Sequence, residues 1–333
     1  MFQIVTPAVL SPIGIAAAGV IRRLFSSRSW RTCAVILCVG SLWSAEAGAV
    51  LIAFGDGTEN TENPIFFGWD YAGEVNASSG TYLGDGWVIT ANHVGPGDLV
   101  LDGTVYPWIP GTEVRLRTNP SNLADLVVFG IWPHPNLAPL VIRTTPPPVG
   151  EFLIMIGSGV NRGSDASWDP NGPLPPPPEP LVGWNWGSGR AKRWGTNEVE
   201  SLTTGLISGT VSFYTSFDDS QVLPEAQTAN GDSGGAVFSL NAGSTQLAGI
   251  IYAAGPTPGQ TPGTALFTNL TFVARLDFYR AEIEAITAVP TSGPVSVPLS
   301  PHLWLFLAGA LAVAGARTAG GPPQVGRGRV TPG

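Results

Sequence analysis

Asn230-Gly231-Asp232-Ser233-Gly234-Gly235 is the stretch of this 333-residue chain that is most informative about its fold. A serine hydroxyl is a weak nucleophile, and it needs an adjacent base and a site that stabilises an oxyanion. Glycines around a serine let backbone N–H groups turn toward a substrate carbonyl, because glycine tolerates positive φ angles. The hexapeptide therefore predicts a reactive serine, provided that a base and an orienting acid occur elsewhere.

The base must be a histidine, and residues 50–289 contain two candidates, His93 and His134. His93 follows the apolar run Val88-Ile-Thr-Ala directly, and the end of a strand places an imidazole at the edge of a cleft. His134 lies in Trp132-Pro-His-Pro, where the prolines indicate a rigid surface turn. We therefore expect His93 to be the base.

The acid that orients the histidine must be nearly buried. Asp125 precedes the apolar run Leu126-Val-Val-Phe, and a carboxylate that opens a hydrophobic strand is costly unless it is paired. Taken alone, Asp125 is better explained as a turn residue that caps the strand. Together with His93 and Ser233, it predicts a partner for the imidazole.

Three segments resemble the catalytic segments of the trypsin/chymotrypsin-like serine proteases (peptidase S1): Thr90-Ala-Asn-His93, Ala124-Asp125-Leu-Val-Val and Gly231-Asp-Ser233-Gly-Gly. The order His, Asp, Ser is also that family's order, whereas subtilisins and α/β-hydrolases have other orders. The resemblance covers about residues 50–288. It implies an all-β fold of two six-stranded antiparallel barrels with the triad between them, followed by a C-terminal helix.

The resemblance also implies a role for each site residue. Ser233 attacks the acyl carbon, His93 accepts and returns the proton, and Asp125 orients the imidazole. The N–H groups of Gly231 and Ser233 form the oxyanion hole. Asn92 and Ala236 replace the alanine and the proline that are usual in the family, and neither change removes a catalytic group.

In this family the aspartate before the serine, here Asp232, pairs with a buried N-terminal amine. No Arg-Ile-Val-Gly-Gly activation sequence occurs in this chain. Ile52 lies roughly where the family has its new N-terminus, so cleavage by signal peptidase is one way to release that end.

The substrate pocket follows from the same resemblance. Counting back six residues from Ser233 places Gln227 at the pocket floor, and Tyr252 and Ala254 belong to the wall, where Ala254 replaces a glycine. A neutral floor offers no full charge to a cationic side chain. We therefore expect cleavage after small or medium uncharged residues rather than after Arg or Lys.

Short β-type runs separated by Gly, Pro and Asn fill the middle of the chain. Residues 81–90 predict a hairpin, and buried strands are expected over 126–131, 152–156 and 247–252. The Pro- and Trp-containing stretch 163–195 is expected to be an irregular loop, either a tolerated surface insertion or a functional segment. One helical face is predicted from Phe272 to Ile286, and Pro290 ends it.

Composition agrees with a β-rich domain. Charged residues make up only 12% of the chain, and its 43 Gly and 31 Pro indicate many turns rather than long exposed helices. Hydrophobic residues make up 44%, which is enough for a core and excludes general disorder. Residues 50–289 contain nine Lys or Arg and 23 Asp or Glu, a balance that argues against nucleic-acid binding. The sequence has no metal cluster, phosphate loop or cofactor signature, so no metal or cofactor is expected.

Residues 1–49 have the order of a secretory signal peptide: Arg28 and Arg31, an apolar run over 32–43, and then Ala-x-Ala. Either the basic region before the run is unusually long, or the true start codon lies downstream. Both cysteines, Cys33 and Cys38, fall inside the run, so the mature protein is expected to contain none.

Residues 290–333 consist of a Pro-rich linker, an apolar segment over 297–316 that is long enough to cross a membrane, and Arg317. This order resembles the PEP-CTERM sorting tail of Gram-negative exported proteins, in a Val-Pro-Leu variant. Two features depart from that tail: the motif is not a literal Pro-Glu-Pro, and a Gly/Pro-rich stretch continues to Gly333. An ordinary membrane anchor is the alternative. Apolar helices are thus expected at both chain ends.

The sequence therefore predicts a serine endopeptidase domain over 50–289 that is exported across the inner membrane of a Gram-negative bacterium. The protein would then stay anchored in the membrane or be released to the cell surface or the extracellular space. Its expected partners are a protein or peptide substrate, signal peptidase, a C-terminal sorting enzyme and the membrane, with no nucleic acid. A catalytically silent binding protein of the same fold at the cell surface is the main alternative, and a structural domain with a chance motif is a third.

Overall fold

The computed structural model describes residues 50–288, except 54, 65–67, 171–178, 204, 220–222 and 242–243. The expected signal peptide and sorting tail, with their apolar helices, lie outside the described residues. Among the described residues, no helix is both long and apolar enough to span a membrane.

The first of two large sheets forms from the N-terminal half of the domain, with strand order β6-β5-β2-β3-β4-β8-β7. Its strands are β2 (Ala72–Val75), β3 (Ser78–Gly84), β4 (Trp87–Thr90), β5 (Leu99–Leu101), β6 (Thr104–Tyr106), β7 (Val114–Asn119) and β8 (Asn122–Gly130). β3 and β4 form the expected hairpin. Asp85 and Gly86 between them have φ angles of 47° and 83°, as a type I′ turn requires.

The second large sheet has the strand order β12-β9-β16-β17-β19-β14-β13 and is also antiparallel. Its strands are β9 (Phe152–Gly157), β12 (Arg193–Glu198), β13 (Ser201–Leu202), β14 (Ser212–Ser216), β16 (Ala236–Asn241), β17 (Ser244–Gly255) and β19 (Leu270–Arg275). The strands expected over 126–131, 152–156 and 247–252 are confirmed as the buried parts of β8, β9 and β17. Each sheet has seven strands rather than six, because short edge strands such as β6 and β13 add to the count.

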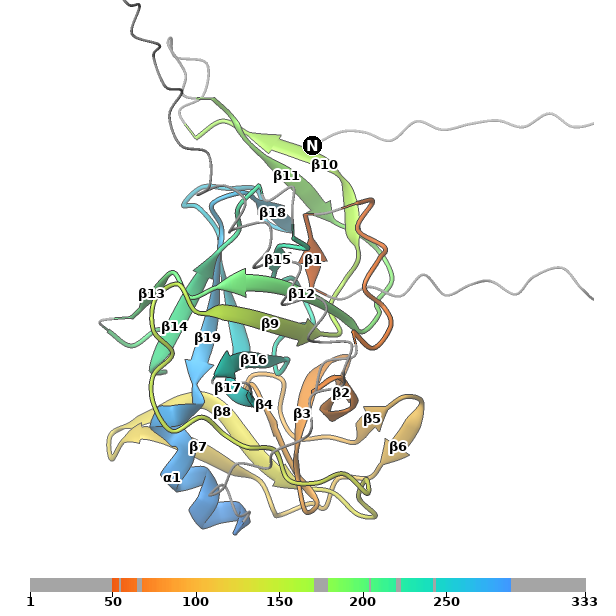
Figure 1. The fold of residues 1–333 in the computed structure, drawn as a ribbon, viewed down its shortest axis with the longest axis vertical. Coiled ribbons are helices and arrows are strands. Elements are labelled where there is room, and N and C mark those ends of the chain that lie inside the picture. The colour runs from red at the N-terminus through yellow and green to blue at the C-terminus, as the bar shows by residue number, and fades with distance from the viewer. Residues whose placement is uncertain are drawn as a thin grey trace, which may run out of the picture. The chain divides into compact units, whose positions relative to one another are not determined.

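The edges of each sheet are hydrogen-bonded back onto the same sheet. In the first sheet, Ile109 N donates to Gly130 O at 2.9 Å, which joins the segment after β6 to the end of β8. In the second sheet, Asn197 Nδ2 of the edge strand β12 donates to Ser216 O of β14 at 2.8 Å. Both sheets therefore curl, and Figure 1 shows the first in orange and yellow beside the second in green and blue.

Two smaller sheets complete the β structure. β10 (Arg162–Trp168) and β11 (Leu181–Trp186) form a hairpin, and β11 pairs on its other side with β18 (Thr264–Leu266). The expectation of an irregular loop over 163–195 is therefore wrong for β10 and β11, whose backbone groups pair with each other and, on the far side of β11, with β18, whereas residues 187–192 are irregular as expected. β1 (Leu51–Ile52) pairs with β15 (Ala226–Gln227).

The two large sheets share one hydrophobic core. Side chains from both contribute to it, including Val88 and Phe129 from the first sheet and Ile154 and Ile250 from the second, all 1% exposed or less. The short 3₁₀ helix η1 (Trp69–Tyr71) adds Trp69 and Tyr71 to the same core. The sheets are thus held together by shared apolar burial, which fixes the loops at their junction.

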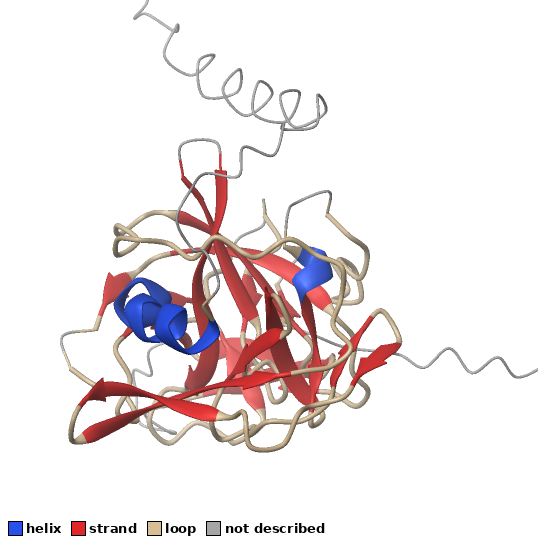
Figure 2. Cartoon of the chain, turned by 90° about the horizontal axis from the view of Figure 1, so that it is seen from below, coloured by secondary structure: helices blue, strands red, loops and turns tan. Residues whose placement is uncertain are grey.

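The C-terminal helix α1 (Leu276–Thr287) packs on this core through Leu276, Tyr279 and Ile283 (Figure 2). The Tyr279 hydroxyl lies 2.8 Å from Thr118 Oγ1 in β7, which ties the helix to the first sheet. The helix expected from Phe272 to Ile286 is confirmed, but it begins at Leu276. Phe272 belongs to β19, where it pairs with Tyr214 of β14. A mostly β fold with one C-terminal helix is therefore confirmed.

Candidate active site

The structure brings His93 and Asp125 together. β4 ends at Thr90 and pairs with β8, which contains Asp125, so the turn after β4 carries His93 over that carboxylate. His93 Nδ1 lies 2.7 Å from Asp125 Oδ2, and the His93 amide donates to Asp125 Oδ1 at 3.0 Å. An ionised carboxylate only accepts hydrogen bonds, so Nδ1 carries the proton and Nε2 is the nitrogen with a free lone pair.

The pair changes the pKa of both groups. The hydrogen bond from His93 to Asp125 raises the pKa of His93, against an opposing effect of burial. Burial favours protonation of Asp125, but the hydrogen bonds and charge of His93 outweigh it, so the pKa of Asp125 is lowered. The His93 side chain is 50% exposed and that of Asp125 is 15% exposed. An imidazole that faces solvent is therefore backed by a mostly buried carboxylate that remains charged at neutral pH.

A second hydrogen bond, made by its backbone amide, holds Asp125 in place. The Asp125 amide donates to Thr210 Oγ1 at 2.8 Å, and Thr210 is fully buried. Sequence reasoning missed Thr210, because a threonine in a loop 85 residues away carries no local signal. His134 lies on an exposed turn, where its Nδ1 is 3.4 Å from the Tyr82 hydroxyl, so it has no carboxylate partner among the described residues.

Ser233 lies between the two large sheets. On one side, Ser79 N of β3 donates to Ser233 O at 3.0 Å, and the Ser78 hydroxyl donates to the same oxygen at 2.9 Å. On the other side, Gly234 N donates to Ile251 O of β17 at 2.8 Å. β3 pairs with β4, the strand that leads to His93, so Ser233 and the histidine are carried by neighbouring segments. None of the hydrogen bonds of the described residues joins the two side chains.

The backbone amides around Ser233 fall into two groups. Those of Asp232, Gly234 and Gly235 each donate to a carbonyl of the fold. Those of Gly231 and Ser233 have no acceptor within the described part of the chain. Gly231 and Gly234 both have φ near +94°, a backbone conformation that L side chains rarely adopt. The loop thus presents the two amides that the sequence predicts for an oxyanion hole.

A comparison with protein-family models identifies the family. The model described as trypsin matches residues 52–274, which include all three predicted catalytic segments. The chain belongs to the trypsin family. A search of curated protein sequences found no significant match.

Several solved structures are similar to this trypsin-family chain. Neuropsin, a serine protease expressed in the limbic system of mouse brain, has 18% identity over 68% of this chain and 97% of its own, with a TM-score of 0.45. The active form of a protease from M. tuberculosis has 14% identity over 72% and 91%, with a TM-score of 0.40. The HtrA-type protease AlgW with a decapeptide has 19% identity over 64% of this chain and 51% of its own, with a TM-score of 0.38. The family model, rather than these structures, identifies the family.

Asp232 directly precedes Ser233 in the loop 230–235 of this trypsin-family domain, which we call the serine loop, and its side chain is fully buried. Its carboxylate accepts hydrogen bonds from the amides of Gly159, at 2.8 Å, and Ala229, at 2.7 Å. Burial raises the pKa of Asp232 to about 7, although these bonds and the charges of Arg190 and Arg193 favour the ionised form. The carboxylate therefore joins the start of this loop to the segment that follows β9.

Ile52 is an internal residue of the uncleaved chain, so its backbone nitrogen belongs to a peptide bond and is not a free amine. It lies within β1, where it pairs with Ala226 of β15. Its carbonyl accepts a hydrogen bond from Arg162 at 2.8 Å, which fixes the segment in that place. In the uncleaved chain the amides of Gly159 and Ala229 bind Asp232, and the pairing with an N-terminal amine that the family resemblance implies stays a prediction.

Arg190 is a second residue that sequence reasoning missed. Its Nη2 donates to Ser158 O and, at 3.4 Å, to Gly231 O. A Cβ atom placed on Gly231 would lie 2.5 Å from this nitrogen, so the guanidinium packs directly against the serine loop. The available signal was compositional, because Arg190-Ala-Lys-Arg193 concentrates basic residues in an acidic domain.

The residues expected to form the substrate pocket have unequal exposure. Gln227 is 1% exposed, and its amide group is bonded to Leu270 O and to the Thr271 hydroxyl, both at 3.1 Å. Tyr252 is 2% exposed, and burial raises the pKa of its hydroxyl to about 12. Ala254 is exposed. None of these three residues lines either cavity described in this structure, so their role in binding substrate stays a prediction.

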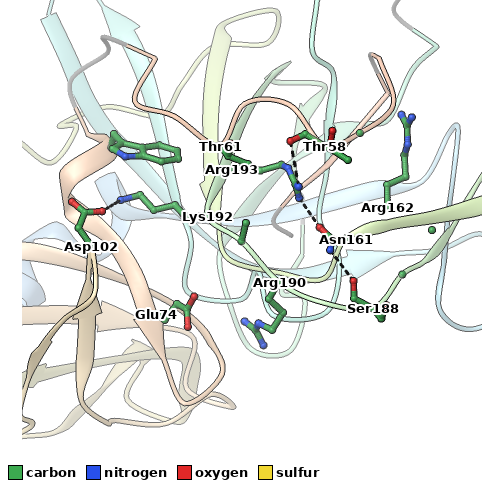
Figure 3. A pocket seen from close by; sticks show the side chains of 15 residues that line it. Thr58, Thr61, Glu74, Asp102, Asn161, Arg162, Ser188, Arg190, Lys192 and Arg193 are labelled. Atoms are coloured by element: carbon green, nitrogen blue, oxygen red, sulfur yellow. Dashed lines mark hydrogen bonds and ion pairs between the residues drawn. The ribbon is translucent and has the colours of Figure 1, made fainter. Parts of the chain in front are cut away.

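The larger of those cavities has a volume of about 760 Å³ and lies between residues 57–61, the first sheet and the loop before β12 (Figure 3). The smaller, of about 260 Å³, lies beside the β10–β11 hairpin. Within the described ranges, no group of three His, Cys, Asp or Glu side chains is placed to hold a metal ion.

Proposed function

We propose that this protein is an exported serine endopeptidase that works through a triad of His93, Asp125 and Ser233. The observation that carries the proposal is the 2.7 Å contact between His93 Nδ1, in the turn after β4, and Asp125 Oδ2 in β8. This contact fixes the tautomer that leaves Nε2 able to accept a proton. The trypsin-family domain supports a serine protease, and the triad roles extend that assignment to named residues.

The reaction follows from these positions. Ser233 Oγ attacks the peptide carbonyl carbon while its proton passes to His93 Nε2, and Asp125 stabilises the imidazolium that forms. The carbonyl oxygen becomes negatively charged and accepts hydrogen bonds from the free amides of Gly231 and Ser233. The tetrahedral intermediate then collapses, the C–N bond breaks, and the departing amine takes the proton from His93. Water repeats these steps on the acyl-enzyme and releases the acid product.

Further proposals concern the pocket, the fold and the destination of the protein. We propose that Gln227, Tyr252 and Ala254 border the substrate side chain, and that the curled sheets correspond to the two barrels of the family. We also propose that residues 1–49 direct export through signal peptidase. Residues 290–333 then place the protein in the membrane until a sorting enzyme acts on them.

Labelling by a fluorophosphonate tests the catalytic proposal directly. The probe reacts with a serine only when a base activates it, so we expect labelling of the wild type and none of Ser233→Ala or His93→Ala. His134→Ala is the matched control and should label normally. Absence of labelling in the folded wild type would contradict the proposal and favour the catalytically silent binding protein.

A further inference from the structure

The larger cavity concentrates the positive charge of an acidic domain. Residues 50–288 contain nine Lys or Arg, and four of these line this one cavity: Arg162, Arg190, Lys192 and Arg193. Two acids, Glu74 and Asp102, line it as well. Asp56 and Glu59 interact electrostatically with Arg162 and Arg193, so Arg190 and Lys192 are the cations that remain for a ligand of opposite charge. The cavity is therefore suited to an anionic group.

Arg193 has a structural task in the cavity wall. Its Nε donates to Glu59 O at 3.0 Å, and its Nη1 donates to Asn161 Oδ1 at 3.0 Å. Figure 3 shows Arg193 extending toward Thr58 and Asn161, while Lys192 extends to the opposite side. These bonds hold the segment that closes one side of the cavity, so its shape is set by the fold itself.

Lys192 and Arg190 are the two cavity cations with N–H donors that have no acceptor among the described residues. The Lys192 side chain is 14% exposed, and its Nζ lies 4.3 Å from the centroid of the Trp69 ring and 3.5 Å from Asp102 Oδ1. Burial lowers the pKa of Lys192, although the nearby Asp102 opposes this effect. The Asp102 side chain is 67% exposed, so this single, long contact only partly compensates a buried ammonium group that has three N–H donors.

The cavity lies beside the reactive serine, on a definite side of it. Ser233 O is bonded to Ser79 N of β3, and Ser79 pairs with the cavity residue Glu74 of β2. On the far side, Gly234 is bonded to Ile251 of β17, the strand that carries the proposed pocket residue Ala254. The proposed pocket and the cavity are thus on opposite sides of Ser233. A peptide that places its acyl side chain near β17 directs its leaving-group side across β3 toward the cavity.

We propose that this cavity binds an acidic side chain of the substrate, located on the leaving-group side of the cleaved bond. The carboxylate lies between Lys192 Nζ and the Arg190 guanidinium, which itself contacts the carbonyl of Gly231. This inference rests on the proposed endopeptidase function and adds a substrate class to it. Glu74 and Asp102 face the same space, so the geometry favours a single carboxylate over a polyanion.

Paired peptides test this proposal. Each pair has the same acyl side and differs only by Glu or Gln at one of the four positions after the cleaved bond. At one of these positions we expect kcat/KM to be about tenfold higher for Glu at low ionic strength, as for a charge-assisted hydrogen bond. The preference should decrease as salt increases, because salt screens the attraction.

Variants assign the preference to the cavity. Lys192→Met keeps an unbranched side chain against Trp69 and should bring the Glu/Gln ratio close to one, while Lys192→Arg should retain most of it. Arg280→Met is the matched control, because it removes one positive charge from α1, where Arg280 pairs with Glu284. It should leave the ratio unchanged. Equal rates for Glu and Gln at all four positions, or an unchanged ratio in folded Lys192→Met, would overturn the proposal.

Binding by the Ser233→Ala protein separates this inference from the catalytic one. Calorimetry with the same peptide pairs requires no turnover, and we expect the Glu peptide to bind about tenfold more tightly. A folded wild type that fails to react with fluorophosphonate but keeps this difference would refute the catalytic proposal and retain the acidic-group site. Normal labelling with equal binding of both peptides would refute the site alone.

Discussion

Replacing Glu225 by Gln should stabilise the folded protein, and only above the pH at which a free glutamate ionises. Glu225 is 9% exposed and lies just before β15. Burial raises its pKa from 4.5 to about 8, and the charge of Asp218 adds to this effect. A hydrogen bond from the Asp218 amide opposes it, and the charge of Glu198 raises the pKa further. The folded state therefore favours the protonated carboxyl, while the unfolded state releases the proton near pH 4.5.

The sign and the size of the effect follow from proton linkage. Below pH 4.5 both states bind the proton and Glu225 costs nothing. Between pH 4.5 and 8 the folded state binds more protons than the unfolded state, so stability decreases as pH increases. The full difference between these pKa values corresponds to roughly 5 kcal/mol at about 1.36 kcal/mol per pKa unit. Partial contact with solvent reduces this to about 2–4 kcal/mol.

Urea unfolding from pH 4 to pH 9 in the Ser233→Ala background, which prevents self-digestion, measures this effect. We expect the free energies of unfolding of Glu225→Gln and its parent to agree at pH 4 and to differ by about 2–4 kcal/mol at pH 9. Glu62→Gln, at an exposed position, is the control and should change stability little at either pH. A gain for Glu225→Gln that is as large at pH 4 as at pH 9 would refute the reasoning, because ionisation would not be its cause.

Four further predictions concern activity and redox stability. Ser233→Ala and His93→Ala should each abolish hydrolysis with the fold intact, and the double variant should be scarcely worse, because the residues act as a unit; additive losses would contradict this. Because the pKa of His93 is raised, the fall of kcat/KM at acid pH should have its midpoint above pH 6.5. Asp125→Asn should lower kcat about 10⁴-fold and move that midpoint to lower pH, because it removes the carboxylate that raises the pKa of His93. Because residues 50–288 contain no cysteine, dithiothreitol should leave the melting temperature of the mature protein unchanged; a large decrease would show that the cysteines near the N-terminus are retained and bridged. A peptide library should show cleavage after small or medium uncharged residues, and dominant cleavage after Arg or Lys would exclude Gln227 as the pocket floor.

The parts of the fold that depend on local pattern could be predicted from the sequence. The β-type runs Thr81-Tyr-Leu and Trp87-Val-Ile-Thr on either side of Gly84-Asp-Gly predict the β3–β4 hairpin, because the turn residues and the strand residues are adjacent in the chain. His93 could be singled out because it directly follows an apolar strand, and Asp125 because it is a carboxylate at the start of an apolar run. The family resemblance then added the order of the three segments, which is information that local pattern lacks.

The parts that depend on distant partners could not be predicted. The stretch 163–195 was expected to be irregular, since its prolines and glycines conceal the β10–β11 pairing and nothing local points to β18. The same limit applies to Thr210, whose hydroxyl accepts a hydrogen bond from the Asp125 amide. It also applies to Arg190, which contacts Gly231 across a sequence separation of 41 residues. A residue that acts through a long-range contact leaves a signal only in three dimensions.

These long-range contacts explain how the serine loop keeps its shape. Val160 N donates to Asn230 O at 2.9 Å, and in a trans peptide this directs the Gly231 amide to the opposite side, away from that bond. The Ser79 hydroxyl of β3 donates to Gly231 O at 2.9 Å and accepts from Ser158 N at 2.8 Å, so one side chain of the first sheet joins two loops of the second. All of these donors are present in the uncleaved chain. The physical condition for an ordered serine loop is therefore the docking of the two sheets, and we expect activity to be lost together with that interface.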